Sequence, residues 1–350
     1  MRLMFVYYLK EDRGSAQDIF NYAQIARARG HEVALYGSPD KGHGFNYSLD
    51  VASADAVIFI FEWPDPSNYC DNLDFVRLLE RVPRRRRVVV DCDGAYNNAI
   101  EIVGDRNHPD ETASRRWIDV CDSLSDKIFQ PTLHPQRPNV RSFLFHAYNP
   151  GWEQPLELRD NEYGMVYVGN NWFRWRGLQR VLQAIEAVRD RVGRVCLVGN
   201  GWDSPAPWAK PDLPEDAYRT DVEYLRRLNI DIRPPIRFDH VIEYMGKGVF
   251  SPVIYRPLFD RLQLVTCRTF ETLAANTLPL FCQDADYVED IYGSDALELM
   301  LPDERPEEKI LDLICRTQYY ADIVLGIRRR LAKDHSYAAR LEALIEIVKS

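Results

Sequence analysis

The feature that most limits what this chain can fold into is a series of short, uninterrupted apolar runs interspersed with segments of helical period. In the first third of the chain the apolar runs are RLMFVYY, HEVALYG, ADAVIFIFEW and RRVVVDCDG, and the helical segments are DIFNYAQIARA and NLDFVRLLERV. A strand that is apolar at every position needs cover on both faces, which is typical of parallel strands flanked by helices. The order therefore predicts a doubly wound α/β lobe.

The same pattern begins again after a polar, proline-containing stretch, AYNPGWEQPLELRDNEYG, at residues 147–164. Beyond it come MVYVGN, a helical segment and RVCLVGNG. A chain of 350 residues also exceeds what one hydrophobic core usually organises. We therefore predict an α/β fold of two Rossmann-like, doubly wound lobes facing a cleft. The first lobe is expected at residues 1–150, the second at 151–330, and a closing helix at 331–350.

Charge and composition limit the partners and the compartment. The formal net charge is -9, so the surface as a whole repels nucleic acid and anionic lipid, although a local basic patch can override that average. The seven cysteines form no CxxC pair and stand mostly in apolar runs, which predicts reduced thiols. The opening LMFVYYL is too short for a signal peptide, and no run approaches the roughly 20 apolar residues that span a bilayer. We expect a cytoplasmic protein without a transmembrane segment, and peripheral contact with a membrane stays open.

Glycine-bearing turns follow three of the predicted strands. They contain Gly14 in RGSAQD, Gly169 in VGNNWFRWRG and Gly199 in VGNGW. At the carboxyl ends of parallel strands, helix N-termini point unpaired N–H groups and the positive ends of their dipoles into the cleft, which suits a phosphorylated ligand. None of the three turns is a GxGxxG fingerprint or a P-loop. A tight turn without a ligand remains the alternative for each one alone.

Four stretches together carry a resemblance to a known family. They are GSAQDIFNYAQIARARGHEV, MVYVGNNWFRWRG, LVTCRTFETLAANTLPLF and HSYAARLEALIEIV. The chain resembles the GT-B glycosyltransferases, nearest the retaining group-1 families and, within them, the spore-maturation-protein-like branch. Only the third stretch is specific. The resemblance implies transfer of a sugar from a UDP- or GDP-sugar to an acceptor hydroxyl, with retention and without a metal. It also implies that the second lobe binds the donor and that the first lobe faces the acceptor.

The third stretch places two charged residues in apolar and small surroundings. By resemblance, Glu271 accepts hydrogen bonds from the ribose hydroxyls, and Thr266 and Arg268 lie beside the diphosphate. The physical chemistry agrees, because a carboxylate accepts two hydroxyl donors and its charge suits the N-terminus of a helix, which we expect near Phe270. The alternative is a pair of Arg268 and Glu271 on an ordinary helix surface, which contributes little.

The chain departs from the family pattern at two places. Retaining members often carry a second glutamate eight positions before the ribose-binding one, and this chain has Gln263 there. By resemblance Gln263 then meets the transferred sugar, without a charge. Members also carry an arginine followed five positions later by a lysine, and Asn171 and Arg176 take those places here. We expect Arg176, with Arg174 as a second cation, to neutralise the diphosphate, because a guanidinium fits two phosphate oxygens. An exposed loop that only covers a strand end is the alternative.

The motif DCD, directly after RRRRVVV, is similar to the DxD with which another glycosyltransferase fold holds a divalent metal. A second α/β lobe has no role in those single-lobe enzymes, so we predict no metal site. Asp91 and Asp93 are instead assigned to the acceptor side of the cleft. Glu62, which follows the apolar run before them, is assigned to the same side.

Two histidines, His134 and His146, fall near late strand ends of the first lobe. His146 is a candidate for acting on the acceptor hydroxyl, and a satisfied interior histidine is the alternative. The aromatic insert at residues 202–222 is expected to form a lid or a subunit contact.

The sequence thus predicts a metal-independent glycosyltransferase whose catalysis is mainly electrostatic. Arg176, helix dipoles and backbone N–H groups would stabilise the departing diphosphate. The expected partners are the nucleotide-sugar donor and a hydroxyl acceptor, nucleic acid is expected only as an acceptor, and no separate cofactor is expected. Three alternatives stay open: a sugar-nucleotide epimerase or phosphorylase of the same architecture, a DNA-base glycosyltransferase, and a non-catalytic nucleotide-sugar-binding protein.

Overall fold

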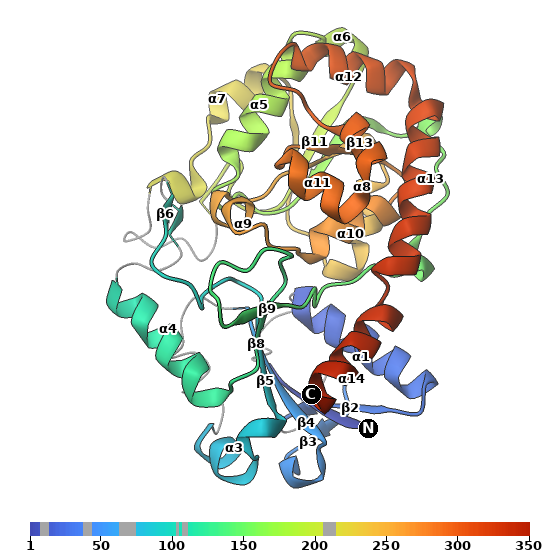
Figure 1. The fold of residues 1–350 in the computed structure, drawn as a ribbon. Helices are drawn as coiled ribbons and strands as arrows, with labels where there is room; N and C mark the ends of the chain where they lie inside the picture. The colour runs from blue at the N-terminus through green and yellow to red at the C-terminus, as the bar shows by residue number, and fades with distance from the viewer. Residues whose placement is uncertain (8–13, 38–43, 63–74, 103–104, 107–110, 206–214) are drawn as a thin grey trace.

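The computed structural model consists of two α/β lobes, one above the other in Figure 1. It describes the chain except for residues 8–13, 38–43, 63–74, 103–104, 107–110 and 206–214. Within the described part, no helix is both long enough and apolar enough to cross a bilayer.

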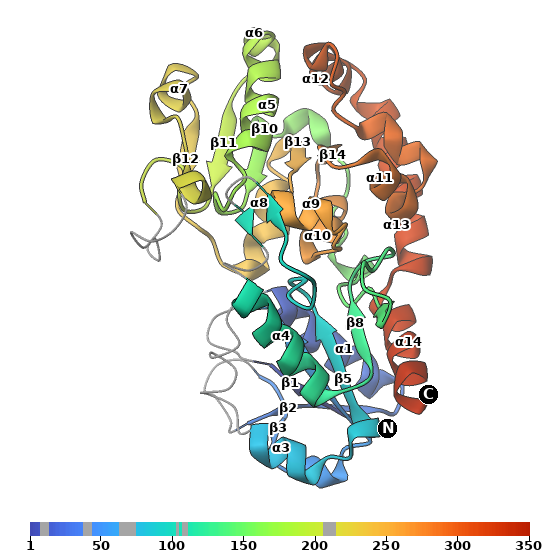
Figure 2. The same cartoon turned by 60° about the vertical axis from the view of Figure 1, so that its left-hand side comes forward.

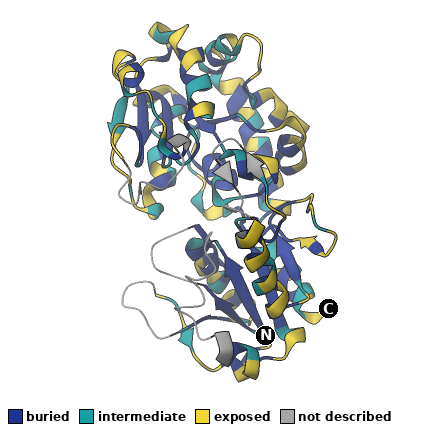
Figure 3. Ribbon diagram, turned by 90° about the vertical axis from the view of Figure 1, so that its left-hand side faces the viewer, coloured by how far each residue is buried: buried dark blue, intermediate teal, exposed yellow. Residues whose placement is uncertain are grey.

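The lower lobe is built on a seven-stranded parallel sheet. Its strands, in spatial order, are β3 (Tyr47–Ser48), β2 (Glu32–Tyr36), β1 (Arg2–Val6), β4 (Ala56–Phe61), β5 (Arg87–Asp91), β8 (Ile128–Gln130) and β9 (Val140–Ser142). Strands β4 and β5 are buried at every position, and the sheet is dark blue throughout its centre in Figure 3. The uninterrupted apolar runs therefore form central parallel strands, as predicted.

Helices cover both faces of this sheet. The covering helices are α1 (Gly14–Ala28) and α14 (Tyr337–Lys349) on one face and α4 (Glu111–Leu124) with α3 (Phe75–Arg81) on the other. Along β1, Leu3 and Phe5 pack toward α1 and α14, whereas Met4 packs in the cluster that contains Trp117 of α4. Successive side chains of a strand point to opposite faces, so both faces of β1 are buried.

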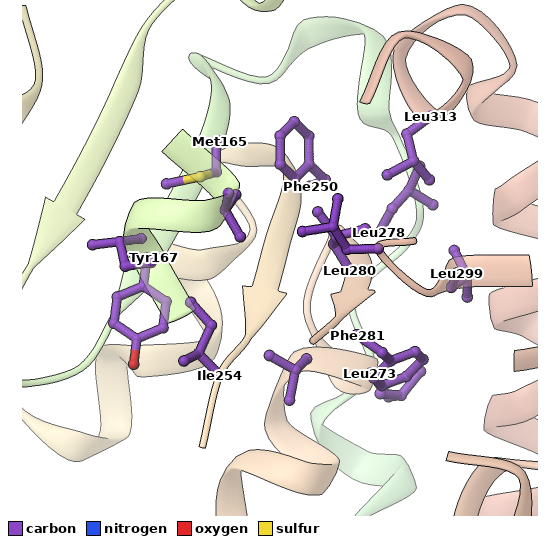
Figure 4. Close-up of a cluster of buried hydrophobic side chains, with 14 of the residues drawn as sticks. Met165, Tyr167, Phe250, Ile254, Leu273, Leu278, Leu280, Phe281, Leu299 and Leu313 are labelled. Atoms are coloured by element: carbon purple, nitrogen blue, oxygen red, sulfur yellow. The ribbon is translucent and has the colours of Figure 1, made fainter. Parts of the chain in front are cut away.

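The upper lobe has a five-stranded sheet whose strands are also parallel. In spatial order they are β12 (Asp231–Arg233), β11 (Val195–Val198), β10 (Tyr163–Val168), β13 (Gly248–Val253) and β14 (Leu278–Phe281). Figure 4 shows the core on one face of this sheet, where Met165, Phe250 and Leu280 meet Leu273 and Leu313 from two helices. The second lobe thus repeats the α/β plan of the first, and the predicted fold class is confirmed.

The helices of the upper lobe follow the strands in order. They are α5 (Trp175–Glu186), α6 (Arg189–Val192), α7 (Val222–Arg227), α8 (Val241–Met245), α9 (Pro257–Arg261), α10 (Cys267–Ala274), α11 (Ala285–Tyr292), α12 (Pro306–Cys315) and α13 (Thr317–Asp334). A small antiparallel pair, β6 (Glu101–Ile102) and β7 (Asp105–Arg106), lies outside both main sheets.

The chain passes between the lobes twice, and the two crossings lie side by side. The first crossing follows β9, and the second joins α13 on the upper lobe to α14 on the lower one (Figures 1 and 2). The Tyr148 N–H donates to the carbonyl of His335 at 2.9 Å, and Tyr148 also forms a parallel bridge with Ser336. The end of the chain is therefore part of the first lobe.

Helix α10 begins earlier than predicted. It starts at Cys267, not near Phe270, because Thr266 adopts an extended conformation just before the helix and its N–H donates to Oγ1 of Thr269 at 3.1 Å. A hydroxyl that satisfies a free N–H in this way favours a helix start at that point. Glu271 consequently lies one turn into the helix and not at its first residues.

Candidate functional site

The N-terminus of α10 is held by a network of hydroxyl groups. The hydroxyl groups of Thr269 and Tyr255 form a hydrogen bond. The Tyr287 hydroxyl lies 3.0 Å from Tyr255 Oη and 3.1 Å from Thr269 Oγ1. The Tyr292 hydroxyl donates to the carbonyl of Thr269 at 3.0 Å. These contacts fix the direction of the helix start. The Thr266 hydroxyl and the first N–H groups of α10 therefore form a preorganised end to which an anion can bind.

Two helix N-termini meet across the lobes at Gly14 and Cys267, the first residues of α1 and α10. A Cβ atom at Gly14 would lie 3.0 Å from Cys267 Sγ and 3.6 Å from Glu62 Oε1. A Cβ atom at residue 14 would thus be crowded, so glycine suits the close approach of the two helix ends. In Figure 1, α10 lies at the base of the upper lobe directly above α1.

Arg268 and Glu271 form an ion pair inside α10, with 3.2 Å between Arg268 Nη1 and Glu271 Oε2. The geometry does not make a hydrogen bond, and Oε2 is buried without a hydrogen-bond partner in the described structure. Glu271 is only 2% exposed. Burial raises the pKa of Glu271, and the charge of Arg268 only partly offsets that effect. The Arg268–Glu271 pair, which was the alternative to a ligand-binding role, therefore exists. It lies in the interior and not on the helix surface, and Oε2 of Glu271 can still accept a hydrogen bond from another donor.

Two glycine turns of the upper lobe pack against each other at the ends of β10 and β11. Gly199 has a φ of 140°, and a Cβ atom there would lie 2.3 Å from the carbonyl oxygen of Gly169. That carbonyl accepts the indole N–H of Trp202 at 3.0 Å. The close approach therefore explains why residue 199 is glycine, and a part of Gly169 and Gly199 in ligand binding stays a prediction.

Asn171, which takes the place of the family's arginine, makes its contacts inside the second lobe. Its side chain is fully buried, and Nδ2 donates to the carbonyls of Gly201 and Arg219 and to the Thr220 hydroxyl, at 3.1, 2.8 and 2.7 Å. The amide therefore braces the loop after β10. The sequence position alone cannot reveal this, because the accepting carbonyls come from residues 30 and 48 positions away.

Arg176 is exposed in the first turn of α5, whereas Arg174, just before the helix, folds back to the carbonyl of Asn170 at 3.1 Å. A Cβ atom at Gly177 would lie 2.6 Å from Cγ2 of Ile254, so the start of α5 is packed close to the end of β13. Of Arg174 and Arg176, it is Arg176 that is exposed at this edge. Gln263 is half-buried with a φ of 50°, in the tight turn that precedes α10.

On the lower lobe, acidic side chains gather beyond the ends of β4 and β5. Glu62 Oε2 accepts the Tyr7 hydroxyl at 2.5 Å and the Ser15 N–H at 3.3 Å. Burial, followed by the nearby charge of Asp93, raises the pKa of Glu62, although Tyr7 and His146 oppose the shift. Asp93 is half-buried. The two acids therefore lie together at the expected edge of the sheet.

Asp91 does not face an open cleft as expected. Its fully buried carboxylate accepts the N–H groups of Ala95 and Tyr96 at 2.9 and 2.8 Å and the amide of Gln130 at 2.8 Å. Burial raises the pKa of Asp91 to about 6 against these hydrogen bonds. Asp91 braces the turn after β5. Among the described residues no group of three or more His, Cys, Asp or Glu side chains is arranged to hold a metal.

His146 is buried at the junction of the lobes, and its Nδ1 lies 2.7 Å from Asp18 Oδ2. The Tyr337 hydroxyl donates to Asp18 Oδ1 at 2.5 Å. Asp18 and Tyr337 were not predicted. A signal for Asp18 exists, since it lies four residues before Tyr22 and therefore on the buried face of α1.

Direct contacts also tie the lobes together on the β8 side. The Val265 N–H donates to the carbonyl of Pro131 at 2.6 Å, and His134 Nε2 lies 2.9 Å from Asp290 Oδ2 on α11. His134 and Asp290 are both exposed. The predicted residues Gly14, Glu62, Asp93, His146 and Glu271 thus belong to one interlobe region, whereas His134 contributes a bridge at its edge.

Two facing Rossmann-like lobes of this kind define the GT-B fold. No protein-family model matches the chain, and no curated protein matches it. Solved structures do. The β-glucosyltransferase of T4 phage aligns over 100% of both chains, with a TM-score of 0.57 and 12% identity. An α-glucosyltransferase in complex with UDP-glucose and DNA containing an abasic site aligns over 100% of this chain and 99% of its own, with a TM-score of 0.63 and 12% identity. At this identity the likeness shows a shared fold.

Proposed function

We propose that the chain is a glycosyltransferase that moves a sugar from a nucleotide diphosphate sugar to an acceptor hydroxyl. One observation carries this proposal: the buried carboxylate of Glu271 keeps an oxygen without a hydrogen-bond partner, one turn behind a helix N-terminus that faces the other lobe. A ribose offers the pair of hydroxyl donors that such a carboxylate lacks, and a diphosphate suits the helix end.

The remaining side chains fit the same chemistry. Arg176 supplies an open positive charge at the second lobe, where the bond between sugar and phosphate would break. Preorganised donors that meet a developing negative charge in a water-poor site are the main source of rate enhancement in such reactions. Glu62 and Asp93 lie on the opposite lobe, where an acceptor hydroxyl would enter. The donor therefore belongs to the second lobe and the acceptor to the first.

The donor that we propose is UDP-glucose, because the T4 phage β-glucosyltransferase has been solved with its UDP-glucose substrate. A complex of the phage enzyme with UDP and Mn2+ is also among the similar structures. Because that complex contains a metal, the shared fold does not decide whether this chain needs one, and we propose that it does not. Metal independence is supported by the bracing role of Asp91, which removes one carboxylate of the DCD motif from the cleft.

The stereochemical course also belongs to the proposal. The family resemblance favours a retaining enzyme of the group-1 type. The structures that share the fold include enzymes named as α- and as β-glucosyltransferases, so the fold by itself is compatible with both products. The spore-maturation-like assignment rests on the sequence stretches alone.

A hydroxyl on a modified DNA base is a second, narrower candidate for the acceptor. The comparisons favour it, since one similar structure is that of a DNA-modifying β-glucosyltransferase and another holds DNA with an HMU base. The net charge of -9 opposes non-specific DNA binding. If the enzyme flips the target base out of the duplex and recognises it in a pocket, binding of that DNA would depend less on the net charge.

We also propose a cytoplasmic location. The six described cysteines are all free, including the exposed Cys315 and the half-buried Cys267 and Cys282. Free and partly accessible thiols are typical of a reducing compartment.

The test is a UDP-release assay with UDP-glucose. Duplex DNA with 5-hydroxymethylated pyrimidines, unmodified DNA and simple sugar alcohols serve as acceptors, and mass spectrometry reads the products. A glycosyltransferase releases UDP only when an acceptor is present, and the acceptor gains the mass of one hexose. Conversion of UDP-glucose without an acceptor would instead indicate an epimerase. Binding without any turnover would indicate a nucleotide-sugar-binding protein.

A further inference from the structure

A chain of hydrogen bonds joins three distant parts of the sequence at the lobe junction. Tyr337 of α14 donates to Asp18 of α1 at 2.5 Å, and the other oxygen of Asp18 lies 2.7 Å from Nδ1 of His146, which follows β9. All three residues are buried, at 4%, 1% and 4% exposure for Tyr337, Asp18 and His146. The last helix of the chain thus reaches the same interlobe region as Glu62 and Glu271.

This arrangement fixes the tautomer of His146. An ionised carboxylate can only accept hydrogen bonds, and Tyr337 already donates to Oδ1 of Asp18. Oδ2 of Asp18 must therefore accept from an N–H at Nδ1 of His146. In the neutral ring, Nε2 then carries a lone pair. Among the described residues, the hydrogen bond of the His146 ring is the one at Nδ1.

Carboxylates surround the imidazole from several elements. Burial lowers the pKa of His146, but the charge and hydrogen bond of Asp18 and the charges of Glu62 and Asp93 outweigh it, so the pKa is raised overall. The pKa values of Glu62 and of Glu271 on α10 are raised by burial, and the His146 ring partly opposes that rise. The charged or titratable groups around the ring are Asp18 and Tyr22 on α1, Tyr337 on α14, Glu62 after β4, Asp93 after β5, and Glu271 on α10.

We propose that Asp18 and Tyr337 are positioning residues that hold His146 with a proton on Nδ1, so that Nε2 takes the proton of the acceptor hydroxyl. The proposal rests on the glycosyltransferase function above. In the step, the acceptor O–H bond breaks and a new N–H bond forms at Nε2. The acceptor oxygen bonds to the anomeric carbon, and the bond from that carbon to the phosphate oxygen breaks with its electron pair on the diphosphate. The hydroxyl must lose its proton whichever face of the sugar it attacks.

Single substitutions at Asp18 or Tyr337 can change how His146 is held. Asp18→Asn keeps the shape, but its amide would donate to Nδ1 and force the proton onto Nε2, which then could not accept one. Turnover should fall by roughly a hundredfold or more. Tyr337→Phe leaves the contact between Asp18 and His146 in place, so turnover should fall only about tenfold. UDP affinity should stay unchanged in both variants.

Tyr22→Phe is the matched control. The Tyr22 hydroxyl donates to the carbonyl of Phe145 at 2.7 Å, and its ring contacts the ring of Tyr337 edge-on. The variant therefore also loses one buried hydrogen bond beside His146, but it leaves the Asp18 contacts intact. Its turnover number and its histidine tautomer should match those of the native protein.

The experiment combines kinetics with nitrogen NMR of histidine-labelled protein, in which Nδ1–H and Nε2–H tautomers give different 15N shifts. The native protein should show Nδ1–H for His146, and its turnover should rise with pH through the pKa of that ring. In Asp18→Asn the tautomer should switch and the rise of turnover should move to lower pH, because the charge of Asp18 then no longer opposes the effect of burial on the pKa of His146. If Asp18→Asn does not fold, the same comparison of Tyr337→Phe with Tyr22→Phe decides.

Three outcomes would overturn the proposal: an Nε2–H tautomer in the native protein, equal turnover in Asp18→Asn and Tyr22→Phe, or loss of the pH dependence in Asp93→Asn while His146→Gln keeps it. The last outcome would assign the proton to Asp93. Absence of any sugar transfer by the native protein would instead contradict the glycosyltransferase function, and the NMR result would still report the tautomer.

Discussion

Glu271 and Arg268 show how burial changes the meaning of a common residue pair. Three residues apart on a helix, such a pair on the surface contributes a few tenths of a kcal/mol. Here Glu271 is 2% exposed and the Arg268 side chain 23% exposed, so neither charge is fully hydrated. A buried carboxylate oxygen that lacks a hydrogen bond is costly unless a ligand supplies the donor. The donor-site assignment depends on this residue.

For Glu271→Gln we expect UDP affinity to fall about tenfold or more, because hydrogen bonds to a charged group contribute about 1.5 to 3 kcal/mol. Titration calorimetry with UDP and 2′-deoxy-UDP measures the effect. The 2′-deoxy ligand should bind poorly to the native protein and lose little further affinity in the variant, since both changes remove the same contact. Arg268→Gln controls for the loss of the ion pair. Equal affinities of the native protein and Glu271→Gln for UDP would make the glutamate structural.

Arg176 has a different expected role, in turnover and not in ground-state binding. Arg176→Ala should lower the turnover number about a hundredfold, because loss of one preorganised donor at a developing charge costs on the order of 3 kcal/mol. Arg180→Ala is the control on the same helix, since that guanidinium is held by the Leu301 carbonyl at 3.0 Å and by Asp303 at 2.8 Å. A turnover number that Arg176→Ala leaves unchanged would remove this residue from the mechanism.

At the scale of elements, the strands were predictable and the helix ends were not. Continuous apolar runs such as ADAVIFIFEW became central parallel strands because no other arrangement buries both of their faces. The predicted start of α10 lies three residues too late. The actual start depends on a hydrogen bond to the Thr269 hydroxyl, and such a bond leaves no periodic apolar pattern in the sequence. Asp91 was misassigned for a related reason: its partners Ala95, Tyr96 and Gln130 are defined only by the folded turn.

The junction of α13 and α14 makes a prediction about pH. His335 lies there, with Arg340 Nη2 at 2.6 Å from its Nδ1, and burial followed by the charge of Arg340 lowers its pKa to about 4. Because the folded pKa is below the unfolded one, the unfolded state binds the proton more tightly, and stability falls as pH decreases from about 6.5 to about 4. The full loss is about 3 kcal/mol.

Urea unfolding at pH 7.5 and pH 5 measures this loss. The native protein should lose more stability between the two pH values than His335→Gln, whose side chain does not titrate. Since other groups titrate in the same range, only the difference between the two proteins is diagnostic. An identical pH dependence in both would mean that His335 is not buried in its neutral form.

At the scale of the whole molecule, the candidate site exists only because the two lobes and the last helix come together. Asp18 and Tyr337 are 319 positions apart in sequence, and Gly14 and Cys267 touch across the lobes. The sequence predicted two α/β lobes. It could not predict which side chains would face each other, because that depends on how the lobes pack at contacts such as that of Val265 with Pro131.

Metal independence is a prediction about the whole site. With Asp91 engaged in its turn and no cluster of metal ligands among the described residues, sugar transfer should survive EDTA. The check is the UDP-release assay with and without the chelator, followed by added Mn2+ or Mg2+. Loss of activity with EDTA and recovery with either metal would mean that Asp93 and its neighbours bind a metal together with the diphosphate.

The central claim is that the cleft between the lobes binds a nucleotide diphosphate sugar, and calorimetric titration of the native protein with UDP-glucose, UDP and UMP tests it most directly. We expect one site per chain for UDP-glucose and UDP. UMP should bind at least tenfold more weakly than UDP, because it lacks the second phosphate, which we expect to meet the N-terminus of α10 and Arg176. Absence of binding by UDP-glucose and UDP at millimolar concentration, or equal affinity for UDP and UMP, would contradict the account.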